Sequence, residues 1–548
     1  MRPMHASEVD DTCPMPITAR CRSCGASLSS YAAGELCGTC KQRVQAALAR
    51  PPDVSPEFWD ASPLASAFAH QHMGEVCRAY RHHPFHAPLH GAGGIPQATV
   101  GHWLGITQAQ VSRIENGPPI RNLDTLVWWA TTLRIPETHL WFDMPHVTVD
   151  VRAITVPPIQ PDPTVVASQH DWRRVRRYLN SRRSDLAKAA ARLYTEETRL
   201  GAAALLTCPA WMPARPIELG NVDLDWTDDL PGVLIDGTEP EAQAQCPLRT
   251  PVHRYARYTS AVRYVDSPTL FENRPSFRLL DASWSTAGGR LRFGLSTYFD
   301  KLATAEALGH EVAWAALQRS IDDLRWSDLP YRQLVDPFDL AGRHLIPAIT
   351  TLTLRRDRRP GTATFLLHWR DPARVATAGG IYDVIPAGEF QPSGIGPGSR
   401  ATDLDLWRNM VREYSEELRG DPEHDGSQGT AVDYQRWPFY RAMTRARASG
   451  RIRAYCLGIG VDALTLAATI TTVVVIDGDA FDELLGDVVD VNAEGVMVRS
   501  IDGEASATGV AFTEMNVRRL LDDEPIAPPG AACLELAWQH RDLLLDRS

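Results

Sequence analysis

The sequence predicts a multidomain α+β protein, and three observations carry that prediction. The chain has 548 residues, of which 44% are hydrophobic and 22% charged, so it is long enough for three or four domains with real cores. Four closely spaced cysteines near the start indicate a small metal-binding segment. A short all-α pattern follows them, and a long C-terminal half then mixes strands with helices.

Residues 1–50 contain the four-cysteine pattern, in which Cys21 and Cys24 form one CxxC pair and Cys37 and Cys40 form a second. Each pair can turn around a metal ion, and two such turns complete a tetrahedral four-thiolate site. Because this segment has few core-forming side chains, bound metal would supply its stability, on the order of 10 kcal/mol. We therefore predict a zinc-ribbon-like segment with a structural Zn²⁺, whose role as DNA contact, protein-docking element or staple stays open.

Residues 63–145 are expected to form an all-α domain around two short helices within 97–117. Four apolar residues would close these helices onto each other: Val100, Leu104, Val111 and Ile114. Gly105 stands at the sharp turn between them, where glycine's access to positive φ removes a steric penalty. Thr107 would cap the second helix with its hydroxyl. Further helices are expected from the apolar spacing before and after this pair.

This stretch resembles the helix-turn-helix of the Cro/phage-repressor (XRE) family, whose DNA-binding domain has the lambda-repressor-like fold. In such motifs the second helix enters the major groove with its N-terminal residues against base edges. The resemblance places Gln108, Ala109 and Arg113 at base-facing positions, where they suit adenine, a thymine methyl and guanine. The other candidate DNA-binding residues lie nearer the phosphates or at the helix cap: Gln97, Thr107, Gln110 and Ser112. The resemblance also implies a homodimer that binds two half-sites.

Residues 146–169 are rich in proline and are predicted to form a semi-rigid linker. Residues 170–200 are predicted to include a basic amphipathic helix with Trp172, Val175 and Leu179 on its apolar face. Six arginines cluster around that face: Arg173, Arg174, Arg176, Arg177, Arg182 and Arg183. They favour equally an additional phosphate-contacting helix or an amphipathic helix that packs or dimerises.

Residues 201–340 are expected to be a mixed α/β region without recognisable chemistry. His310 and Glu311 are adjacent there, and we interpret them as a surface pair rather than as metal ligands.

Residues 341–548 alternate strands with helices, and one expected helix over 403–419 is acidic. Glu413, Glu416 and Glu417 would share one face of it, since residues three and four apart are neighbours on a helix. Three clustered carboxylates repel one another unless a cation neutralises them, and Mg²⁺ prefers such oxygen ligands. The alternative is a charged helix face turned to solvent.

Four residues match the core of the Nudix signature: Arg412, Glu413, Glu416 and Glu417. This region therefore resembles the Nudix family, which implies an α/β/α sandwich. In an active site of that kind, the three glutamates would be catalytic and would hold Mg²⁺ on a nucleotide diphosphate. The sequence departs from the signature at Leu404, Tyr414 and Arg419, and these departures bear on turnover more than on the fold.

The chain carries 67 acidic and 56 basic residues, a net charge of -11, so attraction to DNA must be local. It has no apolar run long enough to span a membrane and no signal-like start, and we expect a cytoplasmic protein that is nucleoid-associated when bound to DNA. Only three basic residues are lysine: Lys41, Lys188 and Lys301. That bias is typical of a high-GC bacterial genome, of the actinobacterial type.

The favoured interpretation is a DNA-binding transcriptional regulator whose Nudix-like domain senses a nucleotide-type ligand. One alternative is a metal-dependent Nudix hydrolase of a nucleoside-diphosphate-linked compound that its helix-turn-helix localises. Another is a zinc-containing adaptor that binds proteins.

Overall fold

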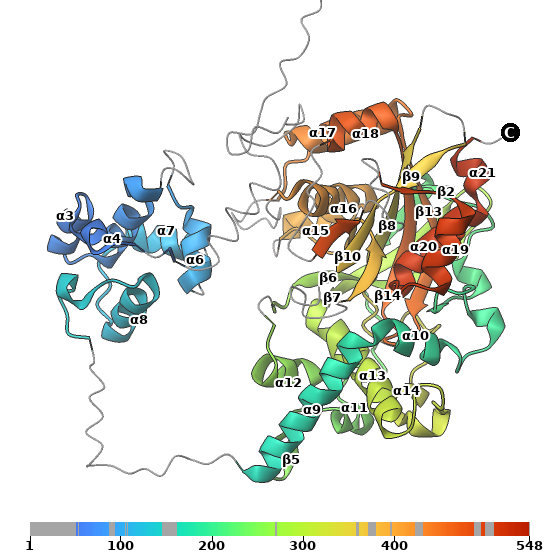
Figure 1. The fold of residues 1–548 in the computed structure, drawn as a ribbon, viewed down its shortest axis with the longest axis horizontal. Coiled ribbons are helices and arrows are strands. Elements are labelled where there is room, and N and C mark those ends of the chain that lie inside the picture. Colours follow the sequence, from blue (N-terminus) through green and yellow to red (C-terminus); the bar gives the residue numbers. More distant parts are fainter. Residues whose placement is uncertain are drawn as a thin grey trace, which may run out of the picture.

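The computed structural model describes residues 51–52, 54–86, 94–104, 106, 108–144, 162–268, 271–357, 361–370, 380–394, 397–421, 431–486, 495–498 and 509–546. These residues form a small all-α unit up to residue 144 and a larger unit of helices and sheets from residue 162 (Figure 1). The mixed α+β class is therefore confirmed. The predicted zinc ligands Cys21, Cys24, Cys37 and Cys40 lie outside the described residues. No helix in the described part of the chain has the length and apolar character needed to cross a bilayer.

The small unit is built from short helices around one core. They are α2 (Pro56–Asp60), α3 (Leu64–Ala69), α4 (Met73–Arg81), α6 (Gln97–Leu104), α7 (Gln108–Asn116) and α8 (Leu123–Leu133). Val100, Leu104 and Val111 are fully buried and Ile114 packs beside them, as the spacing predicted. Phe58 and Trp59 of α2 are also buried in this core, so the unit begins before residue 63.

Local caps explain where two of these helices begin. The side chain of Asn122 accepts a hydrogen bond from the Thr125 amide (2.8 Å) and starts α8. His72 caps α4 in the same way, because its Nδ1 accepts from the Glu75 amide (3.2 Å). Such caps satisfy backbone donors that the first helical turn leaves without partners.

The larger unit contains three main sheets and a small hairpin. The eight-stranded sheet consists of β1 (Leu205–Leu206), β2 (Ile217–Glu218), β8 (Ala348–Arg356), β9 (Ala363–Phe365), β12 (Ala387–Glu389), β13 (Ile452–Asp462), β14 (Ala468–Asp477) and β16 (Val510–Ala511). A three-stranded sheet joins β10 (Leu367–Arg370), β11 (Ile381–Val384) and β15 (Gly495–Val498). Another joins β3 (Val222–Trp226), β6 (Pro275–Trp284) and β7 (Gly289–Thr297), and β4 (Leu248–Thr250) pairs with β5 (His253–Arg254).

The described helices of this unit pack around those sheets. They are α9 (Pro163–Ser181), α10 (Arg183–Ala191), α11 (Pro240–Ala244), α12 (Tyr258–Val265), α13 (Tyr298–Gln318), α14 (Pro330–Gln333), α15 (Pro397–Asp403), α16 (Leu406–Glu413), α17 (Pro438–Ala448), α18 (Gly478–Leu485), α19 (Glu514–Asp522), α20 (Pro528–Gln539) and α21 (Arg541–Leu544).

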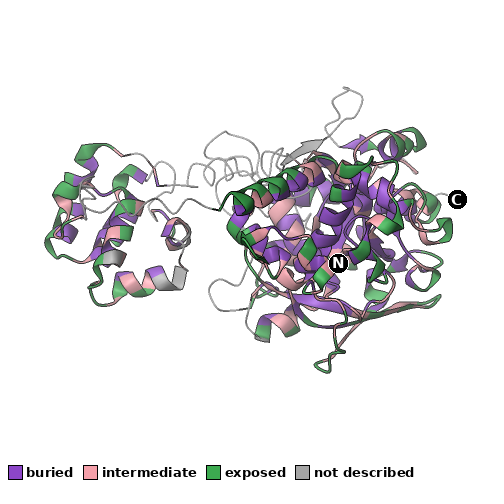
Figure 2. Cartoon of the chain, turned by 90° about the horizontal axis from the view of Figure 1, so that it is seen from below, coloured by how far each residue is buried: buried purple, intermediate pink, exposed green. Residues whose placement is uncertain are grey.

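The eight-stranded sheet is buried on both faces. In β14, Ile470, Val474 and Ile476 belong to one hydrophobic core. Val473 and Val475 point the opposite way, into a second core that includes α20. Strand residues alternate between faces, so a strand this rich in β-branched residues must be covered on both sides. Figure 2 shows the resulting buried interior beneath helices whose outer sides are exposed.

One core crosses the boundary expected at residue 340. The first hydrophobic core runs from Trp172 to Leu485 and joins residues from both of the expected regions. In addition, β1 and β2 pair with β13, so an early part of the unit contributes to the late sheet. The chain from 162 onward is therefore packed as one α+β body, and the Nudix-like identity of its sheet stays a prediction.

The basic segment after the linker is a packed helix. Its first helix, α9, begins at Pro163, inside the stretch expected to be linker. Its apolar face, with Trp172, Val175 and Leu179, is buried. Arg176 pairs with Asp266 (2.9 Å), and Arg183 donates to Glu306 of α13 (2.8 Å). The side of this segment that faces the protein therefore packs in the core of the larger unit.

The expectation that His310 and Glu311 lie at the surface was wrong. Both are buried in α13, with 4% and 2% of their surfaces exposed. The His310 Nδ1 lies 3.0 Å from the Tyr258 hydroxyl. Glu311 accepts hydrogen bonds from the amides of Tyr331 (2.6 Å) and Arg332 (3.0 Å) at the start of α14. Neighbouring helices surround α13, which its own sequence does not reveal.

Burial gives this pair opposite pH dependences. It lowers the pKa of His310 from 6.5 to about 3, so the folded protein holds the ring neutral. The unfolded chain takes up a proton on this histidine below pH 6.5 and the folded protein does not. The free energy of unfolding therefore falls by about 1.4 kcal/mol per pH unit as the pH is lowered from 6.5 toward 3. Burial raises the pKa of Glu311 from 4.5 to about 7, so its contribution is complete below pH 4.5 and is lost as the pH rises to 7.

We predict that His310→Gln, which keeps a hydrogen-bonding group near Tyr258, flattens the acid side of the stability profile. The difference in free energy of unfolding between wild type and variant should shrink by about 3 kcal/mol from pH 6.5 to 4.5, because two pH units are involved. Urea unfolding at several pH values measures it, with exposed His253→Gln as control. A difference that stays constant with pH would contradict the prediction.

Candidate functional sites

The predicted helix pair is formed by α6 and α7. The Ile106 amide donates to the Gly101 carbonyl (2.9 Å) as the chain leaves α6. Gly105 and Thr107 lie outside the described residues, so the predicted turn glycine and helix cap stay predictions. α7 begins at Gln108 and ends at Asn116, directly before Gly117.

Two of the predicted DNA-binding residues lie on the outer side of α7. Arg113 is exposed and Ser112 is partly exposed, while Val111 beside them is buried. Gln108, Ala109 and Gln110 belong to the first turn of the same helix, and their side chains are outside the described part. The outer face of α7 is therefore polar where the structure describes it.

Gln97, predicted to lie near phosphates, points instead to an acidic residue within the unit. Its Nε2 donates to Oε2 of Glu115 at 2.7 Å. Glu115 is 3% exposed and also accepts two hydrogen bonds from Arg81, at 2.7 and 2.8 Å. Cys77 Sγ lies 3.4 Å from the same carboxylate. This Glu115 network joins α4, α6 and α7 through their side chains.

Electrostatics keep the buried glutamate charged. Burial alone would raise the pKa of Glu115, but the hydrogen bonds from Arg81 and Gln97 outweigh it and hold the pKa below its ordinary value. Arg81 also donates to the Ile95 carbonyl (2.7 Å), so its guanidinium has partners on both sides. An ion pair with this geometry orients the helices that carry its members.

The backbones of α4 and α7 approach each other closely. A β-carbon at Gly74 would overlap the carbonyl oxygen of Ile114, so only glycine fits there. Arg78 donates to the Glu115 carbonyl (2.6 Å) and His72 Nε2 lies 3.0 Å from the Gly117 carbonyl oxygen. These contacts fix the C-terminal end of α7 on α4.

Sequence reasoning missed the roles of Arg81 and Glu115. The available signal was Glu115 itself, a carboxylate four residues after Val111 on the inward side of an otherwise apolar stripe. A charged residue at a core position needs a partner of opposite charge. The partner could not be chosen from sequence, because several arginines are near enough along the chain.

The small unit has no excess of positive charge. Residues 54–144 include five arginines and no lysine against seven carboxylates, so DNA attraction would depend on where the arginines lie. Arg113 and Arg121 are both exposed, on α7 and just before α8. This distribution agrees with the expectation that any attraction to phosphate is local.

The acidic helix of the larger unit has three packed anchor points. Asp405 caps α16 by accepting from the Arg408 amide (2.9 Å). Arg412 is buried and donates to the Gln391 carbonyl (2.7 Å). The hydroxyl of Tyr414, which departs from the Nudix signature, is buried 2.7 Å from the Thr353 hydroxyl of β8. The tyrosine thus has a packing role against the sheet.

Glu413, Glu416 and Glu417 are all partly exposed, and two of them contact β12. Glu417 Oε1 accepts from the Ala387 amide (2.9 Å), and the Glu413 carboxylate lies where a β-carbon at Gly388 would be. The three glutamates are not spaced as on the expected α-helix, because residues 414–418 form a π-helical turn. Within the described ranges no three His, Cys, Asp or Glu side chains are arranged to hold a metal ion. The Mg²⁺ site stays a prediction.

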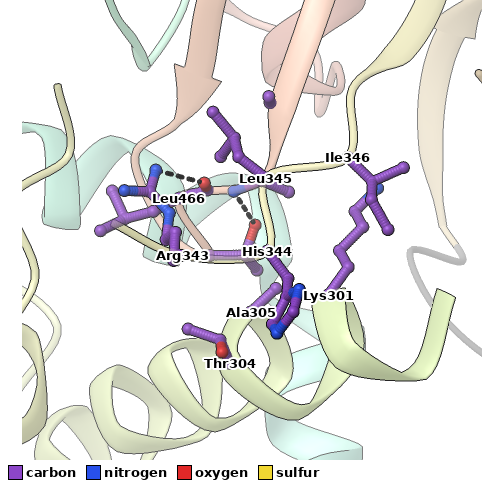
Figure 3. Close-up of a pocket in the computed structure, with 11 residues that line it drawn as sticks. Lys301, Thr304, Ala305, Arg343, His344, Leu345, Ile346 and Leu466 are labelled. Carbon is purple, nitrogen blue, oxygen red and sulfur yellow. Dashed lines mark hydrogen bonds between the residues drawn. The ribbon is translucent and has the colours of Figure 1, made fainter. Parts of the chain in front are cut away.

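A small cavity lies between α13 and the starts of β8 and β14 (Figure 3). Lys301, Thr304 and His344 line it together with the buried Arg343. Lys301 forms an ion pair with Glu389 of β12. The cavity has room for about one water molecule, far less than a nucleotide needs.

Comparison with known proteins assigns no family, since no family model and no curated protein matches the chain.

We predict that Glu115→Ala destabilises the small unit by about 3–5 kcal/mol, because it leaves Arg81 buried without its carboxylate. Hydrogen exchange of the α4, α6 and α7 amides in the full chain would report the loss. Replacing both partners, by Arg81→Met with Glu115→Leu, should recover much of it. Exposed Asp143→Ala serves as control. Unchanged exchange in Glu115→Ala would refute the role of the Glu115 network.

Proposed function

We propose that the protein is a sequence-specific DNA-binding transcriptional regulator that reads the major groove through α7. The observation that carries the proposal is the construction of α7. Its inner side is held by the buried Glu115 network, and its outer side presents Arg113 and Ser112. A helix fixed in this way loses little freedom when it docks, which favours binding.

The side chains assigned to base contact have the chemistry that groove recognition needs. The Arg113 guanidinium can donate two hydrogen bonds to a guanine, and the Gln108 amide can pair with an adenine. Ser112 and Gln110 would contact phosphates, which position the protein but carry no sequence information. Gln97 would contribute indirectly, since its amide supports Glu115.

We further propose that two copies bind together and that the larger unit carries the regulatory input. Two-fold related half-sites about 34 Å apart suit paired α7 helices. A nucleotide-type ligand of the larger unit would regulate binding only if its affinity differs between the free and the DNA-bound protein. The small cavity is no candidate for that ligand in its present form.

We predict that Arg113→Ala weakens binding to the preferred site by about 1–3 kcal/mol and relaxes selection at one base pair. The full chain would first select its site from a pool of randomised duplexes, and fluorescence anisotropy would then compare wild type with variant on that site. Arg436→Ala, at a 90% exposed side chain of the larger unit, should bind as wild type. A pool in which no sequence is enriched would refute the proposal and favour the adaptor.

A metal-dependent hydrolase is the second candidate, and the placement of the acidic helix favours it. Glu413 and Glu417 both approach the 387–388 backbone of β12, so two of the three glutamates meet at one strand. A divalent cation there would help to activate water and would offset negative charge on a diphosphate. The helix-turn-helix would then localise an enzyme.

For this candidate we predict that wild type hydrolyses ADP-ribose with Mg²⁺. The hydrolysis rate of Glu416→Gln should be lower by about 10–100-fold, which is the typical cost of weakening a metal site. Phosphate release after phosphatase treatment measures the rate. Glu514→Gln, at an exposed position on α19, is the matched control. Equal rates for wild type and Glu416→Gln would exclude this site as the catalyst.

A further inference from the structure

The larger unit carries a surface rich in arginine at one end. We call it the arginine surface and define it by exposed residues of α9, the β4–β5 hairpin and α12: Arg173, Arg174, Arg177, Arg249, Arg254 and Arg263. Figure 1 shows α9, β5 and α12 together at the same end of this unit. Only the α9 residues could be anticipated from sequence, because the others lie some 75 residues later in the chain.

Hydrogen bonds tie the three elements together. The Leu248 amide of β4 donates to Ser168 Oγ (2.9 Å), and Gln169 Nε2 donates to the Leu248 carbonyl (3.0 Å). Arg173 Nε donates to the Val265 carbonyl at the end of α12 (2.9 Å). The arginines are therefore carried on a common, rigid support.

The charge of this support is opposite to that of the whole protein. Residues 163–182 contain five arginines and 245–265 contain four, against a single carboxylate, Asp171. Four of the nine have carboxylate partners. Arg176 pairs with Asp266 and Arg257 lies between Asp236 and Asp300, while at the surface Arg174 pairs with Asp171 (3.6 Å) and Arg182 with Asp185 (2.8 Å). In a chain with 67 acidic residues and a net charge of -11, this concentration of arginine is a local exception.

Several of these arginines are open to a partner. Within the described ranges no carboxylate lies within ion-pair distance of Arg177, Arg249, Arg254 or Arg263. Beside them Tyr264 is 74% exposed and stacks on Tyr255, with ring centres 6.2 Å apart. Arg254 also donates to the Cys246 carbonyl, and Arg263 lies over the Phe299 ring (5.3 Å to its centre), but neither of these contacts neutralises the positive charge.

We infer that the arginine surface binds DNA phosphates beyond the site read by α7. Guanidinium groups match phosphate oxygens, and the contacts would be independent of sequence. The inference rests on the proposed function, because α7 would bring the duplex near. The chain from residue 144 to residue 162 can span at most about 60 Å, which is about 17 base pairs of duplex.

The structure favours DNA over an anionic membrane as partner. A helix that lies on a membrane inserts its apolar face between lipids. In α9 that face, with Trp172, Val175 and Leu179, is already buried in the protein core. The exposed side of α9 therefore carries charged residues and no apolar face that could insert into a membrane. Such a surface suits binding to a phosphate backbone.

The test is the salt dependence of binding by the full chain to a 60-base-pair duplex of random sequence. The triple variant Arg177→Ala, Arg249→Ala, Arg263→Ala should lower the slope of log K against log salt by about 2–3, since each lost phosphate contact removes about 0.9. The same three positions changed to Lys should keep the slope, because the charge remains. The matched control is Arg436→Ala, Arg441→Ala, Arg445→Ala around α17, also exposed.

A slope that is unchanged in the alanine triple variant, or lowered equally in the control, would overturn the inference. The inference would also be overturned if the alanine triple variant lost binding to vesicles of anionic phospholipid but bound the duplex as wild type does. Failure of the proposed function would look different, because no sequence would be selected while random duplex still bound through the arginine surface. Conversely, Arg113→Ala would relax the sequence preference of binding. In that variant, replacing Arg177, Arg249 and Arg263 by alanine should still lower the slope of log K against log salt.

Discussion

Both units depend on the same constraint, which is that a carboxylate removed from water must be neutralised by a partner. In the small unit Glu115 meets Arg81 and Gln97, and in the larger unit Glu306 meets Arg183 (2.8 Å) and Arg176 (3.8 Å). Each set joins neighbouring helices to one that is more distant in the sequence. Glu115 links α4, α6 and α7, while Glu306 links α9, α10 and α13. Removing one partner from such a set costs far more than the pair contributes, so the helices are held in one arrangement.

Buried arginines play the corresponding role at the turn between β13 and β14. Arg332 donates to the Ala463 carbonyl (2.7 Å), and Arg343 donates to the Leu466 carbonyl (3.1 Å). Burial lowers the pKa of Arg343 to about 10, which shows how far it is removed from water. Both arginines come from the region before residue 345 and hold a turn that follows residue 462. This is one reason why the middle and C-terminal regions form a single body.

The charge distribution connects the fold to the proposed function. An acidic protein can approach DNA only through surfaces where arginines outnumber carboxylates. Two such surfaces among the described residues are the outer side of α7 and the arginine surface around α9. The first would supply selectivity through base contacts, and the second would supply affinity that falls as salt rises. Buried ion pairs keep Arg176 of α9 in the core, while Arg173, Arg174 and Arg177 are exposed.

The local parts of the fold could be predicted from the sequence. Apolar spacing located α6, α7 and α8, because a helix of this length must bury one stripe and its own residues define the stripe. The acidic helix was located from its clustered carboxylates, although the π-helical turn at 414–418 changed the spacing of its glutamates. The four-cysteine segment and the first turn of α7 stay predictions.

The sequence by itself determined the helix pair within 97–117 and the apolar faces of these helices and of α9, since these properties depend on residues a few positions apart. The tertiary structure alone decided that Glu115 pairs with Arg81, that His310 and Glu311 are buried, and that β1 and β2 join β13. It also brought 245–265 against α9 and so created the arginine surface. These features require contacts between residues far apart in the chain, and pairing of that kind depends on how whole elements pack, which local pattern does not encode.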